Sequence, residues 1–125
     1  MTTTVTIQQS YNASGQAAQF SHSFTDTMFE TLNESILTGN TLAAGITIDV
    51  SEITVLIMTS DQAVTITSQN GSQAAIVLAA GVPYIWTTSS YFTNKLTHDV
   101  TTLSVENASG STADFKLYVL LDSTP

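Results

Sequence analysis

Cysteine and arginine are absent from this chain of 125 residues, and lysine occurs only as Lys95 and Lys116. Without cysteine the protein has no disulfides, no thiolate metal sites and no thiol chemistry. Ten acidic residues against two basic ones give a net charge of −8. Because neutralising phosphates requires a basic surface, we expect no nucleic-acid partner. We expect no binding to anionic membranes for the same reason.

Long apolar runs are missing as well. The longest, residues 74–82 and 117–121, are far shorter than the roughly 20 residues that a membrane-spanning helix needs. Residues 1–7 contain neither a basic segment nor an apolar core, so we expect no signal peptide.

Charged residues make up only 10% of the chain, well below the usual quarter or so. Threonine and serine take their place, and threonine packs well on the surface of β-strands. A surface with few charges also suits a protein that neighbours will cover, since the cores of interfaces are depleted of charge.

The hydrophobic pattern is that of β-structure. Residues 113–121 alternate apolar and polar side chains, and residues 100–106 place Val100, Leu103 and Val105 among Thr and Ser. A period of two gives one buried and one solvated face. The sequence Asn-Ala-Ser-Gly at 107–110 supplies residues that tolerate a tight connection. We therefore predict that the chain ends in an antiparallel hairpin.

Short β-branched runs separated by turn residues continue through most of the chain. They lie at residues 3–9, 18–24, 45–50, 53–58, 63–67 and 73–78, and turns are expected at 12–15 and 69–72. The nearly continuous apolar run at 53–58 is typical of a central strand covered on both faces. We predict an all-β protein, a single jelly-roll-like β-sandwich domain of seven to nine short antiparallel strands over residues 1–125. Residues 1–9 form an N-terminal arm or an edge strand in this prediction.

The segment 28–37 is ambiguous. Met28, Leu32 and Ile36 recur every four residues, which favours a short amphipathic helix. Residues 27–30 fit a helix capping box, and Gly39 fits a helix C-cap. The many Ser and Thr residues favour a strand instead. We predict a strand to about residue 24 and then a short helix near 28–37.

Few residues are suited to catalysis. His22 and His98 are the only histidines. A hydrolase would take His98 as base and Asp99 as its orienting partner, but adjacent residues on a strand point to opposite faces. No motif for a nucleophile elbow, a P-loop or a metal site is present. We expect no enzyme, no cofactor and no bound metal.

The acidic residues are scattered through turns, as solvated loop ends are. A loop calcium site built from Asp49, Glu52 or Asp61 is the alternative to ordinary turn capping by aspartate.

Residues 83–92 contain the only tryptophan, Trp86, together with Tyr84, Tyr91 and Phe92. Three interpretations compete for this aromatic segment: packing in the core or at its rim, a subunit or partner interface, and a platform for sugar rings. Aromatic residues dominate binding hot spots, which supports the interface. We expect Trp86 to face inward and Tyr91 and Phe92 to be exposed.

Residues 78–86, with Gly81, Pro83 and Trp86, residues 99–110, which begin Asp-Val-Thr-Thr-Leu, and the final strand 115–122 resemble small virion structural proteins of tailed bacteriophages. The nearest type is the capsid decoration, or cement, protein. The likeness covers about residues 46–122, whereas residues 26–40 have no counterpart. It implies a protein without catalytic residues or cofactors that binds the major capsid protein on the virion surface, commonly as a homotrimer, and stabilises the capsid.

In this interpretation the N-terminal arm, with Val5 and Ile7, and the aromatic segment, with Tyr84, Trp86, Tyr91 and Phe92, are the candidates for contact with a neighbouring subunit or the capsid. The alternatives are a phage tail or adaptor component and a carbohydrate-binding module that uses Trp86, Tyr91 and Phe92.

Overall fold

Ten β-strands and one short 3-10 turn account for most of residues 2–68 and 73–122, which the computed structural model describes. The strands are β1 (Thr3–Ala13), β2 (Gln16–Asp26), β3 (Met28–Ile36), β4 (Thr41–Ile48), β5 (Ile53–Ser60), β6 (Val64–Ser68), β7 (Ile76–Leu78), β8 (Tyr84–Thr87), β9 (Val100–Glu106) and β10 (Ala113–Leu121), and the turn η1 is Val50–Glu52. No helix in these two stretches has the length and apolarity needed to cross a membrane. The turn predicted at 69–72 lies outside the described residues.

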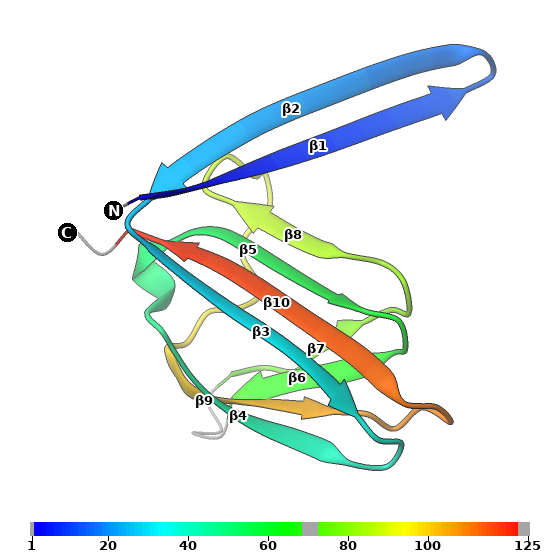
Figure 1. The fold of residues 1–125 in the computed structure, drawn as a ribbon, viewed down its shortest axis with the longest axis vertical. Helices are drawn as coiled ribbons and strands as arrows, with labels where there is room; N and C mark the ends of the chain where they lie inside the picture. The colour runs from blue at the N-terminus through cyan, green and yellow to red at the C-terminus, as the bar shows by residue number, and fades with distance from the viewer. Residues whose placement is uncertain (1, 69–72, 123–125) are drawn as a thin grey trace.

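The strands from β3 to β10 form a jelly roll. Four antiparallel pairs, β3–β10, β4–β9, β5–β8 and β6–β7, make one long ribbon. The ribbon folds over so that β10 also pairs with β5 and β9 with β6. Two sheets result, with the orders β3-β10-β5-β8 and β4-β9-β6-β7 (Figure 1). The predicted all-β, jelly-roll-like sandwich is confirmed.

Strand β3 replaces the helix predicted near 28–37, and it raises the strand count of the described residues above the predicted seven to nine. It pairs with β10 along its whole length, from Met28 opposite Leu121 to Ile36 opposite Ala113. The helix prediction was wrong because a repeat of four residues is also a multiple of two. A strand therefore brings Leu32 and Ile36 to the same face, where they join the core.

The predicted C-terminal hairpin is also wrong, although both of its strands exist. Strand β9 lies in one sheet between β4 and β6, and β10 lies in the other between β3 and β5. Residues 107–112 therefore cross from sheet to sheet rather than closing a turn between paired strands. Alternation identifies a strand and its buried face, but it does not identify the neighbour with which the strand pairs.

The core lies between the two sheets and is filled from the inner face of each. Strand β10 contributes Phe115, Leu117, Val119 and Leu121, all essentially without exposure to solvent. The outer face of this sheet is covered too, but only at one end. There Val55 and Leu120 are buried beneath the first two strands. The prediction that β5 is covered on both faces is confirmed at Val55.

Strands β1 and β2 form a hairpin outside both sheets, which we call the arm (Figure 1). Its two-residue turn is Ser14-Gly15, with φ of 53° and 80°. Positive φ at both positions is the type I′ geometry that matches the twist of paired strands. At the other end the Thr54 hydroxyl donates a hydrogen bond to the Asp26 carboxylate, which ties the arm to β5. The predicted N-terminal segment thus belongs to a two-stranded arm that begins at Thr3.

Candidate binding surface

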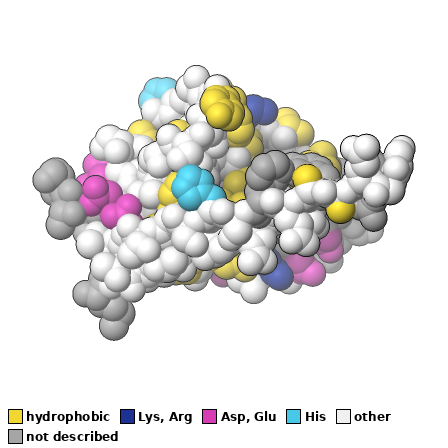
Figure 2. Space-filling model, turned by 90° about the horizontal axis from the view of Figure 1, so that it is seen from above, with side chains coloured by type: hydrophobic (Ala, Val, Ile, Leu, Met, Phe, Trp, Pro, Cys, Tyr) yellow, Lys and Arg dark blue, Asp and Glu magenta, His cyan; other side chains and the backbone are white. Residues whose placement is uncertain are grey.

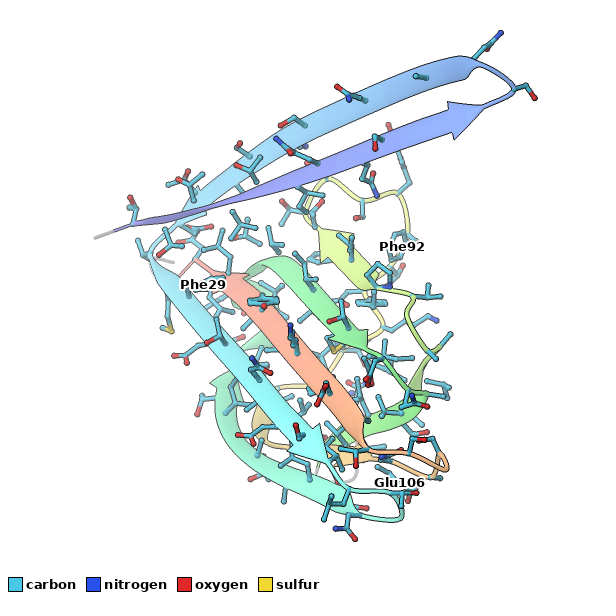
Figure 3. The ribbon with its side chains drawn as sticks, turned by 45° about the vertical axis from the view of Figure 1, so that its right-hand side comes forward. Phe29, Phe92 and Glu106 are labelled. Atoms are coloured by element: carbon cyan, nitrogen blue, oxygen red, sulfur yellow. The ribbon has the colours of Figure 1, made fainter. Side chains whose placement is uncertain are left out.

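An open groove of about 320 Å³ lies between the arm and strand β8 with the loop that follows it. Ten of the described residues line it: Ile7, Gln9, His22 and Phe24 from the arm, and Ile85, Thr87, Ser89, Ser90, Tyr91 and Phe92 from β8 and the loop. Phe92 lies on the side of the sandwich that faces the arm, whereas Glu106 lies at the far end (Figure 3). The groove is therefore formed by two parts of the chain that are about 60 residues apart in the sequence.

Alternation along β8 decides which of its residues reach the groove. Tyr84 and Trp86 are half-buried and pack against the core cluster. Ile85 and Thr87 face the other way, toward the arm, and line the groove. The expectation that Trp86 faces inward is confirmed, and its indole N–H donates to the carbonyl oxygen of Phe92 at 2.9 Å. This bond holds the loop after β8, which carries Tyr91 and Phe92, over the end of the strand.

Tyr84 holds the same loop from below. Its hydroxyl donates to Oδ1 of Asn94 at 2.6 Å and accepts from the backbone N–H of Lys95 at 2.9 Å. Its ring meets Phe92 edge-to-face with centroids 6.3 Å apart. Burial raises the pKa of Tyr84 above its ordinary value of 10.0, partly offset by the hydrogen bond from Lys95.

Replacing Tyr84 by phenylalanine should change how stability depends on pH. Because the pKa of Tyr84 is raised in the folded state, its contribution to stability is complete below pH 10.0 and is lost as pH rises through the folded-state pKa. Wild-type protein should therefore lose stability above pH 10.0 more steeply than Tyr84→Phe. Urea unfolding at a series of alkaline pH values measures this, and parallel pH profiles for the two proteins would contradict it.

The aromatic side chains at the mouth of the groove are open to solvent, as the sequence predicted. Tyr91 is fully exposed and Phe92 is 51% exposed. A fully exposed ring contributes nothing to the fold through burial. Exposed aromatic side chains beside a groove are typical of contact sites.

The structure brings all six predicted contact residues to this region, in three different roles. Ile7, Tyr91 and Phe92 line the groove itself. Tyr84 and Trp86 support the loop from inside, as described above. Val5 packs beneath the arm against the buried cluster of Phe24, Val55 and Leu120, so it seats the arm rather than offering an open contact.

Sequence reasoning missed the contribution of the second strand of the arm, His22 and Phe24, whose rings lie with centroids 4.3 Å apart. The positions of the charged residues in the sequence indicate which segments form the groove. All twelve charged side chains fall in 26–61 and 95–122, and residues 2–25 and 62–94 contain none. These two charge-free segments are the ones that the fold brings together, because each residue that the structure describes in the groove lining belongs to one of them.

The view from the arm side shows the same separation. Among the side chains described, hydrophobic and polar uncharged ones cover most of the centre of this face, and the visible Asp, Glu and Lys side chains lie toward its margins (Figure 2). The protein has a net charge of −8, yet a partner could cover this face without desolvating a carboxylate. Such a face is suited to contact with another molecule. We call residues 3–25 of the arm together with residues 84–94 of β8 and its loop the uncharged face.

A larger hollow of about 500 Å³ lies on the arm alone and is lined by Gln8, Gln9, Ser10, Gln19 and Ser21. The described part of its lining offers amides and hydroxyls from a single hairpin. We take the groove as the better candidate because two distant segments and the exposed rings meet there.

The residues that the sequence offered for catalysis or metal binding form hydrogen bonds within the fold. Oδ1 of Asp99 accepts the backbone N–H of Val50 at 3.0 Å, and Nδ1 of His98 lies 3.0 Å from the hydroxyl of Thr97. Asp49 caps the turn η1 through the backbone N–H of Ser51. Within residues 2–68 and 73–122, no three His, Asp or Glu side chains gather as metal ligands would.

The fold and surface thus define a jelly-roll β-sandwich with a projecting two-stranded arm and one uncharged face. Comparison with protein-family models, with curated proteins and with solved structures finds no match to this chain. The resemblance to phage decoration proteins therefore stays a prediction.

Proposed function

We propose that this protein is a non-enzymatic structural protein of a phage virion, which decorates the capsid and stabilises it by binding the major capsid protein. The observation that carries the proposal is the uncharged face, on which the arm and the exposed rings of Tyr91 and Phe92 stand beside one groove. A decoration protein needs a rigid body and contacts repeated by symmetry, with few charges to desolvate.

The jelly roll supports the same proposal. In each sheet the two central strands, β10 and β5 in one and β9 and β6 in the other, are paired on both edges. Buried side chains from both sheets fill the core between them. The two residues that a hydrolase would use have structural contacts, because Asp99 accepts the backbone N–H of Val50 and His98 lies against the hydroxyl of Thr97. What distinguishes this molecule is thus a surface for contact.

Binding to capsid shells tests the proposal. Purified protein should co-sediment with shells assembled from the major capsid protein of the same genome, and binding should saturate at a fixed number of copies per capsomer. The bound shells should also withstand heat or chelator treatment better than bare shells. Protein that stays in the supernatant at every concentration would exclude the decoration role.

A carbohydrate-binding module is the second candidate, favoured by the exposed ring of Tyr91 next to hydroxyl-bearing Ser89 and Ser90. Binding on a glycan array that disappears in Tyr91→Ala, while shells are ignored, would replace the first proposal with this one. The substitution Thr101→Ala, at an exposed position on β9, is the control for nonspecific effects.

A further inference from the structure

His22 is the only side chain of the uncharged face that gains a charge near neutral pH. Residues 2–25 and 62–94 contain no Asp, Glu, Lys or Arg, and His22 is the only histidine in either segment. Histidine is the side chain that changes charge between about pH 5 and pH 8. The face is therefore uncharged only while His22 is neutral, and one proton gives it a positive charge.

His22 lines the groove from β2, on the side of the arm that faces β8 and its loop. The strand register places it opposite Ile7 on β1, and its ring lies against Phe24 with centroids 4.3 Å apart and planes tilted by 30°. In the free protein the His22 side chain is exposed, so water solvates both of its charge states. A partner seated in the groove would remove that water.

The described lining holds no group that could neutralise a protonated His22. Strand β1, strand β8 and its loop place no Asp, Glu, Lys or Arg in the lining, and Tyr91 is its only other titratable side chain. Tyrosine loses its proton only at alkaline pH. The one acidic residue of the arm, Asp26, lies about 13 Å from His22 along β2, and its carboxylate accepts a hydrogen bond from Thr54. A covered imidazolium would therefore have no counter-ion from the described part of this chain.

We propose that protonation of His22 releases the partner that fills the groove, so that binding through the uncharged face depends on pH. Burying an ion without a counter-ion is costly, and a covered His22 is therefore neutral. The complex then binds fewer protons than the free protein, so its affinity falls as pH falls and is constant where histidine is already neutral. This inference rests on the proposed function, since it concerns regulation of the same capsid contact.

Co-sedimentation with shells of the major capsid protein of the same genome, at about pH 7.5 and about pH 5.5, measures the effect. The wild-type dissociation constant should be about tenfold higher at the lower pH. His22→Gln keeps a polar side chain that takes up no proton, so its affinity should be the same at both pH values. His22→Lys is charged at both, and it should bind at least about tenfold more weakly than the wild type does at the higher pH.

His98→Gln is the matched control, because His98 is the only other histidine and is exposed outside the groove lining. It should keep the full pH dependence of the wild type, which separates His22 from the carboxylates and from any titration of the shell. Circular dichroism at both pH values checks that each variant is folded. If His22→Lys does not fold, the two glutamine variants still decide the matter.

The inference is overturned if wild-type affinity is constant or rises at the lower pH. It is also overturned if the pH dependence persists in His22→Gln or disappears in His98→Gln. Tight binding to shells that is independent of pH would leave the decoration role intact and contradict only the role of His22. A wild type that binds shells at neither pH would overturn both, so the two failures are distinguishable.

Discussion

Replacing Leu120 by alanine is expected to lower the free energy of unfolding by about 2–5 kcal/mol, the usual range for a buried leucine. Leu120 points to the outer face of its sheet, where side chains are commonly solvated. Here it has no exposure, because the base of the arm covers it through Phe24 and Val55 lies beside it. The loss therefore measures how firmly the arm is seated. Urea or thermal unfolding gives the value.

Lys116→Ala is the matched control, since Lys116 lies on the same outer face of β10 at an exposed position. That change is expected to alter stability by no more than about 0.5 kcal/mol. If Leu120→Ala costs no more than this control, the base of the arm does not cover the sheet in solution. The assignment of Val5 and Phe24 as seating residues would then be wrong.

Asn107→Asp is expected to destabilise the protein by about 2–4 kcal/mol at neutral pH, since it leaves buried carbonyl groups without donors. The side chain of Asn107 is fully buried where the chain crosses between sheets. Its Nδ2 donates to the carbonyl oxygens of Ile36 and Ser111, both at 2.8 Å, and its Oδ1 accepts from the backbone N–H of Ser109 at 3.0 Å. A carboxylate keeps the shape but replaces both donors by a charged acceptor.

The loss should depend on pH with a definite sign. Burial among carbonyl oxygens raises the pKa of the new carboxyl group above the ordinary value of about 3.9. The deficit relative to wild type should thus be smallest below about pH 4 and should grow as pH rises through the folded-state pKa. Asn33→Asp, at an exposed position on β3, makes the same chemical change and should cost little at any pH. A deficit at Asn107 that matches this control would show that the crossing does not depend on the amide.

The strands and their buried faces were predictable, because a strand with one buried face needs apolar and polar residues in alternation. This alternation is visible in the amino-acid sequence. Phe115, Leu117 and Val119 were assigned to one face from the sequence alone, and all three are buried. The segment at Met28–Ile36 could not be assigned in this way, because a four-residue repeat fits a helix and a strand equally. Pairing with β10 over its full length decides for the strand.

The candidate surface was predictable in part. Tyr91 and Phe92 were expected to be exposed, since they stand in a polar loop, and they are. Their neighbours His22 and Phe24 across the groove could not be foreseen, because they come from a segment about 70 residues earlier that only the folded arm brings close. The charge-free runs at 2–25 and 62–94 mark both sides of the groove, but a run of neutral residues carries no information about its partner.

The sequence Asn-Ala-Ser-Gly occurs twice, and its two copies show what the local sequence decides and what the tertiary structure decides. At residues 12–15 it forms the two-residue turn of the arm, with positive φ at Ser14 and Gly15. At residues 107–110 it begins a crossing between sheets, where the buried Asn107 side chain donates two hydrogen bonds and accepts two from Ser109. The sequence by itself determined the all-β class, the buried faces and the distribution of charge, because these depend on local composition and period. Which strands pair, how the ribbon rolls and which neutral segments meet were decided by the tertiary structure, because these depend on contacts between residues far apart in the chain.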